Sequence, residues 1–294
     1  MRNSFIKELC KLNRAHENII LVVGDLGFSV VEPFLDEFPN NFINAGVAEQ
    51  NMTGLAAGMA SEGYQVFTYS IANFPTFRCA EQFRNDVDYQ NIGVTVVTVG
   101  GGLAYGALGY SHHAIQDYAL MRTMPNTLIL SPGDPYEVIS CMRYLNNNPQ
   151  PSYLRLGKAG EKILHKDIPD LKPGIWSPVS EVNDHEGIIL STGAALQNAI
   201  QMQKKQKYRN FSVYSLPLWG MSSKEKQIEQ LSKIPKLITI EDHLEDGGFG
   251  SWMLEATKDR KDLLNKIEII SLNPKVCGLV GSQDYLNKEG GIIK

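Results

Sequence analysis

Val94-Thr-Val-Val-Thr-Val99 is the strongest strand signal in the chain, and the glycine-rich stretch Gly100-Gly-Gly-Leu-Ala-Tyr-Gly-Ala-Leu-Gly109 follows it directly. A run without breaks suits a strand buried on both faces, as in a parallel sheet covered by helices. On either side of it, short apolar runs alternate with segments of helical spacing. We expect strands at residues 19–23, 41–44, 65–69, 127–130 and 152–155, and helices at residues 5–16, 47–62, 80–88, 117–124 and 135–144. This alternation predicts a mainly parallel sheet with helices on both faces.

The remainder of the chain repeats this pattern after a change of composition. Lys, Asp, Pro and Gly dominate residues 160–184, which is typical of a linker. Beyond it we expect strands at residues 187–190, 211–214, 237–240 and 267–270, with helices at 194–204, 224–232 and from residue 251. The sequence therefore predicts an α/β protein of two domains, 1–165 and 186–294, each with a mainly parallel sheet and joined by a linker at 166–185.

Composition and charge argue against several classes of protein. The chain has 294 residues, of which 43% are hydrophobic, and its net charge of −4 disfavours a nucleic-acid-binding surface. Glycines interrupt the charge-free segment 89–116, so we expect no membrane span there. The cysteines form no CxxC pair, which favours neither a zinc site nor a disulfide framework: Cys10, Cys79, Cys141 and Cys277. Scattered thiols and a charged start without an apolar run favour a soluble protein of the cytoplasm.

Candidate ligand-binding residues follow the expected strands, because ligands of α/β sheets gather beyond the carboxyl ends of strands. Asp25 and Ser29 follow the first strand; they are either ordinary turn residues or part of a site. Glu49 opens a helix rich in Ala and Gly. Its carboxylate is either solvent-exposed and favoured by the helix dipole, or partly buried with a raised pKa and able to exchange a proton with a ligand. Close packing of small residues favours burial.

Two further segments carry candidate side chains. Phe74, Phe77 and Arg78 lie at a strand-to-helix turn, where the aromatics could be core residues and the arginine could meet an anion. His112 and His113 end the glycine loop, whose backbone could approach a ligand closely. Adjacent histidines point in different directions and are poor joint metal ligands, so they are either structural or suited to proton transfer. The sequence contains no GxxxxGK[ST], GxGxxG, GxSxG or HExxH motif.

Together these segments resemble the transketolase superfamily of thiamine-diphosphate enzymes. Asn44-Ala-Gly-Val-Ala-Glu49-Gln-Asn-Met is similar to the pyrimidine-domain motif, in which the glutamate contacts the aminopyrimidine ring of the cofactor. Gly109-Tyr-Ser-His112 resembles a second family segment, and Glu241-Asp-His-Leu-Glu-Asp-Gly-Gly-Phe-Gly resembles the signature of the transketolase C-terminal domain. The resemblance covers nearly the whole chain.

One part of the family pattern is missing. The diphosphate-binding domain carries Gly-Asp-Gly followed by Asn-Asn, which hold a divalent metal and the diphosphate. This chain has no Gly-Asp-Gly, and so it lacks this paired pattern. The resemblance therefore implies the C-terminal subunit of a split transketolase. Thiamine diphosphate would lie between unlike chains, with Mg or Ca held mainly by an N-terminal partner subunit, in a heterotetramer that acts in carbohydrate metabolism.

The resemblance also implies roles for individual residues. Glu49 would stabilise the imino tautomer of the aminopyrimidine, and Phe74, with Phe77 as the alternate, would stack on that ring. His112 would face the substrate and assist proton transfer. Asp25 and Ser29 match a position that lines the substrate channel.

The chain departs from ordinary transketolases where a sugar phosphate is held. A family histidine falls at Gly100 and a family arginine at Gly157. Arg155 and Lys158 flank the second gap, and Arg78 could supply charge from another side. The substrate could therefore be unphosphorylated or carry a different anchoring group.

We consider three functions. The first is transfer of a two-carbon ketol unit from a ketose-like donor to an aldose-like acceptor. The second is the β subunit of a 2-oxoacid dehydrogenase E1, or a decarboxylating enzyme like deoxyxylulose-phosphate synthase. The third is a non-catalytic regulatory subunit, against which Glu49 argues because such a subunit needs no activating carboxyl group.

Overall fold

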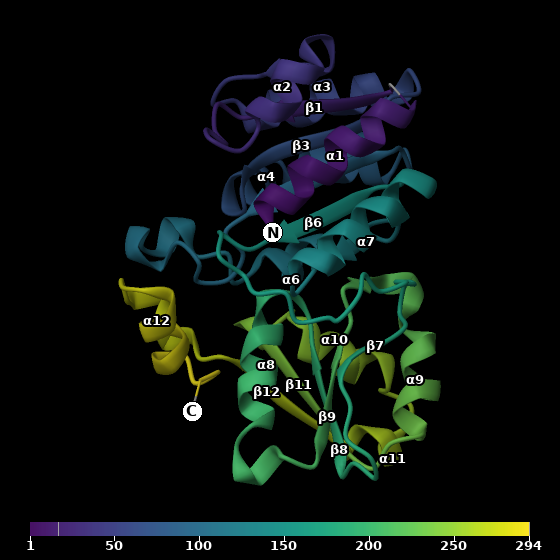
Figure 1. Cartoon of the computed structure of the whole chain (residues 1–294), viewed down its shortest axis with the longest axis vertical. Coiled ribbons are helices and arrows are strands. Elements are labelled where there is room, and N and C mark those ends of the chain that lie inside the picture. Colours follow the sequence, from purple (N-terminus) through teal and green to yellow (C-terminus); the bar gives the residue numbers. More distant parts are fainter. Residues whose placement is uncertain (17, 294) are drawn as a thin grey trace.

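The first half of the chain supplies all but one strand of a seven-stranded sheet with β4 at its centre. The computed structural model describes residues 1–16 and 18–293. The strand order is β10-β5-β6-β4-β3-β1-β2, and within it only β10 pairs antiparallel (Figure 1). The strands are β1 (Ile19–Val23), β2 (Phe42–Asn44), β3 (Gln65–Ile71), β4 (Val94–Val99), β5 (Leu128–Leu130), β6 (Ser152–Leu156) and β10 (Leu218–Trp219). Every residue of β4 is buried, as its unbroken run predicts.

Helices cover both faces of this sheet. Alternate side chains of β3 point to opposite faces, so Val66 and Phe67 belong to two different apolar clusters. One cluster contains residues from α1 (Arg2–His16), α2 (Glu32–Glu37) and α7 (Pro135–Asn147). The other contains residues from α3 (Glu49–Ser61), α6 (Asp117–Met121) and a π-helical turn (Phe83–Asp88) that continues α5 (Ala80–Gln82). The predicted two-faced α/β arrangement is confirmed.

The second half builds a five-stranded sheet in the order β12-β11-β8-β9-β7, with β7 antiparallel. Its strands are β7 (Ser177–Ser180), β8 (Gly187–Ser191), β9 (Phe211–Ser215), β11 (Leu237–Leu244) and β12 (Ile267–Leu272). One face packs on α8 (Leu196–Gln203), and the other on α9 (Glu225–Ser232), α10 (Phe249–Ala256) and α11 (Lys261–Leu264). A last helix, α12 (Gln283–Glu289), stands apart from these layers (Figure 1).

The two halves share a core. The Trp219 ring on β10 lies 5.2 Å from the Tyr118 ring and 5.2 Å from the Trp252 ring, measured between centroids. Because β10 comes from the second half of the sequence but pairs with β5, the chain returns to the first sheet after entering the second. This joint makes one edge of the first sheet depend on the second half of the chain.

The sequence patterns missed several elements. The segment 166–185, expected to be a linker, contains β7, which pairs with β9. The short elements α2, β10 and α12 were also not expected. The two helices form fewer than two turns and β10 has only two residues, so no apolar period repeats in any of them. The proposed domain limits remain predictions. Among the described residues, no helix has the length and apolar character needed to cross a membrane.

Candidate functional site

Glu49 lies at the first turn of α3, beside the carboxyl ends of β1 and β3. Only 2% of its surface is exposed, as the small residues of its helix predict. Arg78 Nη1 donates a hydrogen bond to Glu49 Oε2 at 3.0 Å, and Ser70 Oγ lies 3.5 Å from Glu49 Oε1. The carboxyl group is therefore buried beside one half-exposed cation, whose side chain is 51% exposed.

An aromatic wall extends from this ion pair. The Arg78 guanidinium lies over the Phe74 ring at 4.5 Å from its centroid, and the Phe74 ring meets the His112 ring edge-on at 5.4 Å. Glu49 and His112, which are far apart in sequence, thus lie at two ends of one line of contacts. Phe77 is 48% exposed. The structure therefore places Phe74 in this line of contacts, a choice between the two aromatics that the sequence leaves open.

The loop after β1 carries Asp25 and Ser29. Both have positive φ values, 55° and 64°, a conformation that costs free energy in residues other than glycine. Asn44, at the end of β2, forms two hydrogen bonds with Asp25. Its Nδ2 donates to Asp25 Oδ1 at 3.0 Å, and Asp25 N donates to Asn44 Oδ1 at 3.1 Å. Ser29 N donates to Glu32 Oε1 at 2.7 Å. Both predicted residues are exposed at the same edge as Glu49.

Arg155 does not fit the predicted role of a substrate ligand. Only 2% of it is exposed, and its Nε donates to Asp117 Oδ2 at 2.7 Å. Its Nη1 donates to Asp242 Oδ1 at 2.6 Å and to Tyr118 OH at 3.1 Å, and its Nη2 donates to Ala114 O at 2.7 Å. The guanidinium is thus satisfied inside the protein, and it joins the two halves of the chain rather than facing a ligand.

Lys158 is linked to His112 by the ring of Tyr105, which lies between them. Its Nζ lies 5.3 Å from the centroid of the Tyr105 ring, and that ring lies 6.5 Å from the His112 ring. Tyr105 also occupies the space in which a side chain at Gly100 would lie. At Gly157, the other gap in the family pattern, that space is taken by the Glu161 side chain. Both gaps are therefore filled by the chain's own side chains.

The glycines of the loop 100–113 face protein rather than open space, which corrects the expectation of a ligand-facing backbone. A Cβ atom built on any of four of them would collide with a neighbouring side chain: Tyr105 at Gly100, Arg155 at Gly101, Asp242 at Gly102 and Leu286 at Gly106. The loop needs glycine because its own Tyr105, a side chain of β6 and side chains of the second half of the chain all pack closely against its backbone. No local signal in the sequence could have identified these partners.

The segment that resembles the C-terminal signature forms the joint between the halves. Glu241 accepts hydrogen bonds from Phe249 N at 2.5 Å and Gly250 N at 2.8 Å, at the start of α10. Burial raises the pKa of Glu241 to about 8, although these two backbone bonds act in the opposite direction. His243 stacks on the Tyr118 ring at 5.1 Å. These residues orient the second half rather than contact the Glu49 site.

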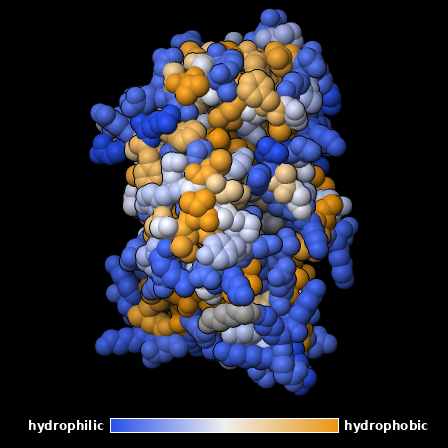
Figure 2. All heavy atoms as spheres, turned by 90° about the vertical axis from the view of Figure 1, so that its left-hand side faces the viewer, coloured by the Kyte–Doolittle hydropathy of each residue, from blue (hydrophilic) through white to orange (hydrophobic). Residues whose placement is uncertain are grey.

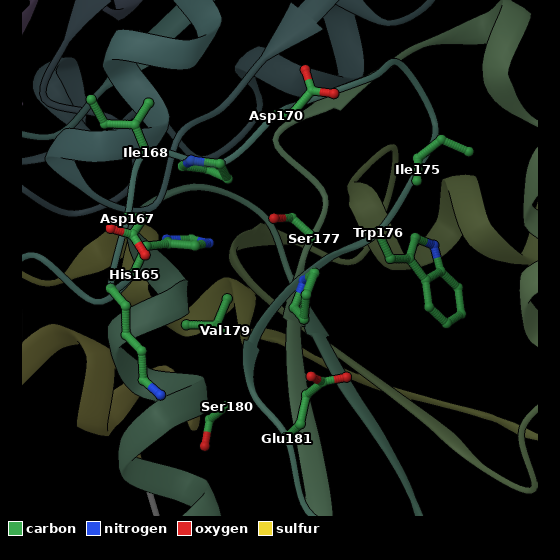
Figure 3. Close-up of a pocket in the computed structure, with 13 residues that line it drawn as sticks. His165, Asp167, Ile168, Asp170, Ile175, Trp176, Ser177, Val179, Ser180 and Glu181 are labelled. Atoms are coloured by element: carbon green, nitrogen blue, oxygen red, sulfur yellow. The ribbon is translucent and has the colours of Figure 1, made fainter.

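A cavity of about 630 Å³ lies in the connecting segment, away from this edge. Figure 3 shows Trp176 and the carboxylates of Asp167, Asp170 and Glu181 around it. It is lined by residues 165–170 and 175–181, so it contains none of the predicted site residues. Within the described ranges, no group of three or more His, Cys, Asp and Glu side chains is placed to hold a metal ion.

Large apolar side chains are exposed on the loops at the edge that carries Glu49. Figure 2 shows the face to which these loops project, with apolar side chains in orange. Phe28 is 74% exposed and Val47 is 72% exposed, and others of this kind are Phe77, Leu108 and Tyr110. Such a concentration is typical of a surface that another chain covers.

Comparison with known proteins identifies this arrangement. Residues 1–160 match the family described as transketolase, pyrimidine binding domain. The chain belongs to the transketolase family. A protein of Methanocaldococcus jannaschii called transketolase C-terminal section is 31% identical over 293 residues, 99% of this chain and 92% of that protein. One of the subunits of an apulose-4-phosphate transketolase from Phocaeicola vulgatus is 30% identical over 88% of this chain and 83% of that protein.

Other relatives extend the comparison. A 1-deoxy-D-xylulose-5-phosphate synthase of Clostridium perfringens is 31% identical over 86% of this chain but only 41% of its own length. The solved structure of a split-gene transketolase, described as an inactive β4 tetramer, has a TM-score of 0.85 at 26% identity and covers 99% of this chain and 93% of that chain. A transketolase of Pichia stipitis, at 20% identity and a TM-score of 0.80, shares the fold over 44% of its chain. The resemblance seen in the sequence motifs is confirmed: this chain is similar to the C-terminal subunits of split transketolases.

Proposed function

We propose that this chain supplies the pyrimidine half of a thiamine-diphosphate site and, with an N-terminal partner subunit, transfers a two-carbon ketol unit from a ketose-like donor to an aldose-like acceptor. The observation that carries the proposal is Glu49, a buried carboxyl group at a helix start beside an aromatic ring and an exposed apolar surface. Thiamine diphosphate, when bound, supplies the carbon nucleophile and the electron sink that ketol transfer requires.

The residues around Glu49 fit an aminopyrimidine ring. A heterocycle with ring nitrogens and an amino group needs a carboxyl partner and an apolar face, and Glu49 and Phe74 provide these. Glu49 would share a proton with the ring, which a buried carboxyl group does better than a solvated one. Arg78 must leave the carboxylate as the ring enters. Its half-exposed side chain has room to do so.

Residues beyond Glu49 would handle the substrate. His112 would donate a hydrogen bond to a substrate hydroxyl and hold the proton that moves there. Asp25 and Ser29 would line the entrance, and Lys158 and Arg78 would provide positive charge. Because both family phosphate positions are filled by the chain's own side chains, we expect the substrate to be unphosphorylated or held at a different point.

A partner subunit would complete the site. The chain lacks the Gly-Asp-Gly that, with a following Asn-Asn, holds the metal and diphosphate in the family. The exposed apolar loops around Glu49 provide a surface for such a chain. The solved relative described as an inactive β4 tetramer supports the need for an unlike partner, and we propose a heterotetramer of two subunits of each kind.

The decarboxylating alternative has one observation in its favour, the similarity to 1-deoxy-D-xylulose-5-phosphate synthases. Incubating the reconstituted complex with a ketose donor and, separately, with pyruvate distinguishes the two reactions. We expect consumption of the ketose in the presence of an aldose and no release of CO2. Consumption of pyruvate with release of CO2 would contradict ketol transfer and support the decarboxylating reaction.

Replacing Glu49 tests the proposal directly. Glu49→Gln should leave assembly intact and lower turnover by at least about 10²–10⁴-fold, the usual contribution of a positioned proton-transfer group. Glu81→Gln, which changes an exposed glutamate, is the matched control and should retain activity. Unchanged turnover in Glu49→Gln would favour the non-catalytic regulatory subunit.

Calorimetry with the isolated chain tests the need for a partner. The chain alone should bind thiamine diphosphate weakly, and addition of Mg²⁺ should not tighten binding. Tight metal-dependent binding by this chain alone would contradict the split site.

A further inference from the structure

The loop that carries His112 is closed at its base and held from outside its own sheet. Gly102 and Ala114 exchange two backbone hydrogen bonds, of 2.8 and 2.9 Å, which form the base of the loop. Directly beside this base, the Asp242 side chain packs on Gly102, which has a φ of +66°. The loop therefore leaves β4 already fixed to the end of β11.

The far part of the loop rests on α12. Leu286 of α12 is fully buried and packs on the Cα atom of Gly106. Gly281 N, just before the helix, donates a hydrogen bond to Gly106 O at 3.2 Å. Two loop residues share an apolar cluster with residues around α12: Leu103 and Ile115 with Leu272, Val276, Leu286 and Ile292. Figure 1 shows α12 beside this loop and outside the helices that cover the second sheet.

A short series of backbone hydrogen bonds leads from α12 to the imidazole. Gly109 N donates to Gly106 O at 3.2 Å, and His112 N donates to Gly109 O at 2.9 Å. The buried His113 places its Nε2 3.4 Å from the same Gly106 carbonyl. One carbonyl group is therefore contacted by the chain before α12 and by both turns of the loop, so a shift of α12 moves the turn that presents His112.

We propose that α12 is a positioning element for the active-site loop, and that Leu286 is the positioning residue that fixes His112 against Phe74. The proposal rests on the function proposed above for His112. It assigns a task to the end of the second half of the chain, which contributes no side chain to the Glu49 pair. The buried residues of the α12 cluster belong to none of the other three apolar clusters, and this cluster meets the second sheet at the ends of β11 and β12. Loss of the α12 contact should therefore free the loop without unfolding either sheet.

Hydrogen exchange on the full chain tests the physical part of this proposal. Leu286→Ala should speed exchange of the amides of residues 103–112 by at least about tenfold, while β4 and β11 stay protected. Leu231→Ala is the matched control, because Leu231 is equally buried but lies on α9 in a different cluster. Unchanged exchange in the loop of Leu286→Ala would overturn the proposal.

A second variant changes the loop side of the contact between Gly106 and Leu286. Gly106→Ala places a methyl group against Leu286 and the Gly281 carbonyl oxygen, so it should push α12 away and reproduce the faster exchange. If only Leu286→Ala has the effect, the helix acts through something other than this contact and the proposal fails.

Kinetics of the complex with the partner subunit test the functional part. Leu286→Ala should lower kcat/KM by about 10–100-fold, the scale expected when a catalytic group is displaced by about 1 Å. The thiamine-diphosphate concentration at half-saturation should stay within about twofold, because Glu49 and Phe74 do not contact α12. If kcat/KM and the affinity for thiamine diphosphate fell by equal factors, Leu286→Ala would have disrupted the whole site, and the positioning role would be overturned. A wild-type complex without turnover would refute the proposed function, whereas the exchange result would still decide whether α12 holds the loop.

Discussion

Replacing Arg155 by Met measures the strength of the joint between the two halves. Arg155 is 2% exposed and lies between two carboxylates, with Nε 2.7 Å from Asp117 Oδ2 and Nη1 2.6 Å from Asp242 Oδ1. Arg155→Met keeps much of the length of the side chain but leaves both carboxylates without their partner. Breaking a buried ion pair by removing one member costs about 3–5 kcal/mol of the free energy of unfolding.

The assay is thermal unfolding of the isolated chain. A loss of about 3–5 kcal/mol lowers Tm by roughly 6–20 °C at the usual 2–4 °C per kcal/mol for chains of this class. The matched control is Arg260→Met, because Arg260 is 45% exposed and its partner Asp262 is 58% exposed, and exposed pairs contribute about 0–1 kcal/mol.

The result that refutes this reasoning is specific. A loss in Arg155→Met below about 1 kcal/mol at about pH 8, or no larger than that in Arg260→Met, would mean that the buried guanidinium is not the link between the halves.

Three further outcomes follow from other contacts. Burial raises the pKa of Glu137 to about 7, above its ordinary 4.5, so the wild-type chain should lose stability as the pH rises from about 4.5 through 7. In denaturant titrations, the free energy of unfolding should fall less between about pH 5 and about pH 8 in Glu137→Gln than in the wild type. An equal fall in both would show that Glu137 is not the cause. In the complex, Phe74→Ala should weaken thiamine-diphosphate binding by about 2–10-fold, and Phe77→Ala should weaken it less; the reverse order by calorimetry would make Phe77 the stacking residue. Gly102→Ala should lower the free energy of unfolding by about 1–3 kcal/mol, because Gly102 has a φ of +66° and the Asp242 side chain fills the space beside it. Gly54→Ala is the control, since Gly54 has open space around it in α3, and it should leave the stability unchanged or raise it; thermal unfolding measures both.

Local sequence patterns predicted the burial of Glu49 and the location of His112. The small residues after Glu49 correctly predicted its burial, since they allow the helix to pack closely. The position of His112 after a strand correctly predicted that it would lie at the same edge of the sheet. The sequence could not choose between Phe74 and Phe77, because neighbouring residues at a strand-to-helix turn differ in direction only once the turn is formed.

Arg155 shows where local reasoning fails. A positive residue at the end of a strand is equally compatible with a substrate anion and with a partner inside the protein. Its partner Asp242 is 87 residues away, beyond the reach of any periodicity. The glycine loop shows the same limit. Its glycines indicated a close approach, but the approaching side chains come from β6, β11 and α12 as well as from the loop's own Tyr105.

The sequence by itself determined the alternation of strands and helices, the family motifs and the presence of a carboxyl group, that of Glu49, at the start of a closely packing helix. These depend on the period of apolar residues and on residue type, which are local properties. The tertiary structure alone decided that Arg155 is internal, that Tyr105 fills the space at Gly100 and that α12 supports the loop of His112. Those outcomes depend on which distant segments meet in space, and that is set by the packing of two sheets around a shared core.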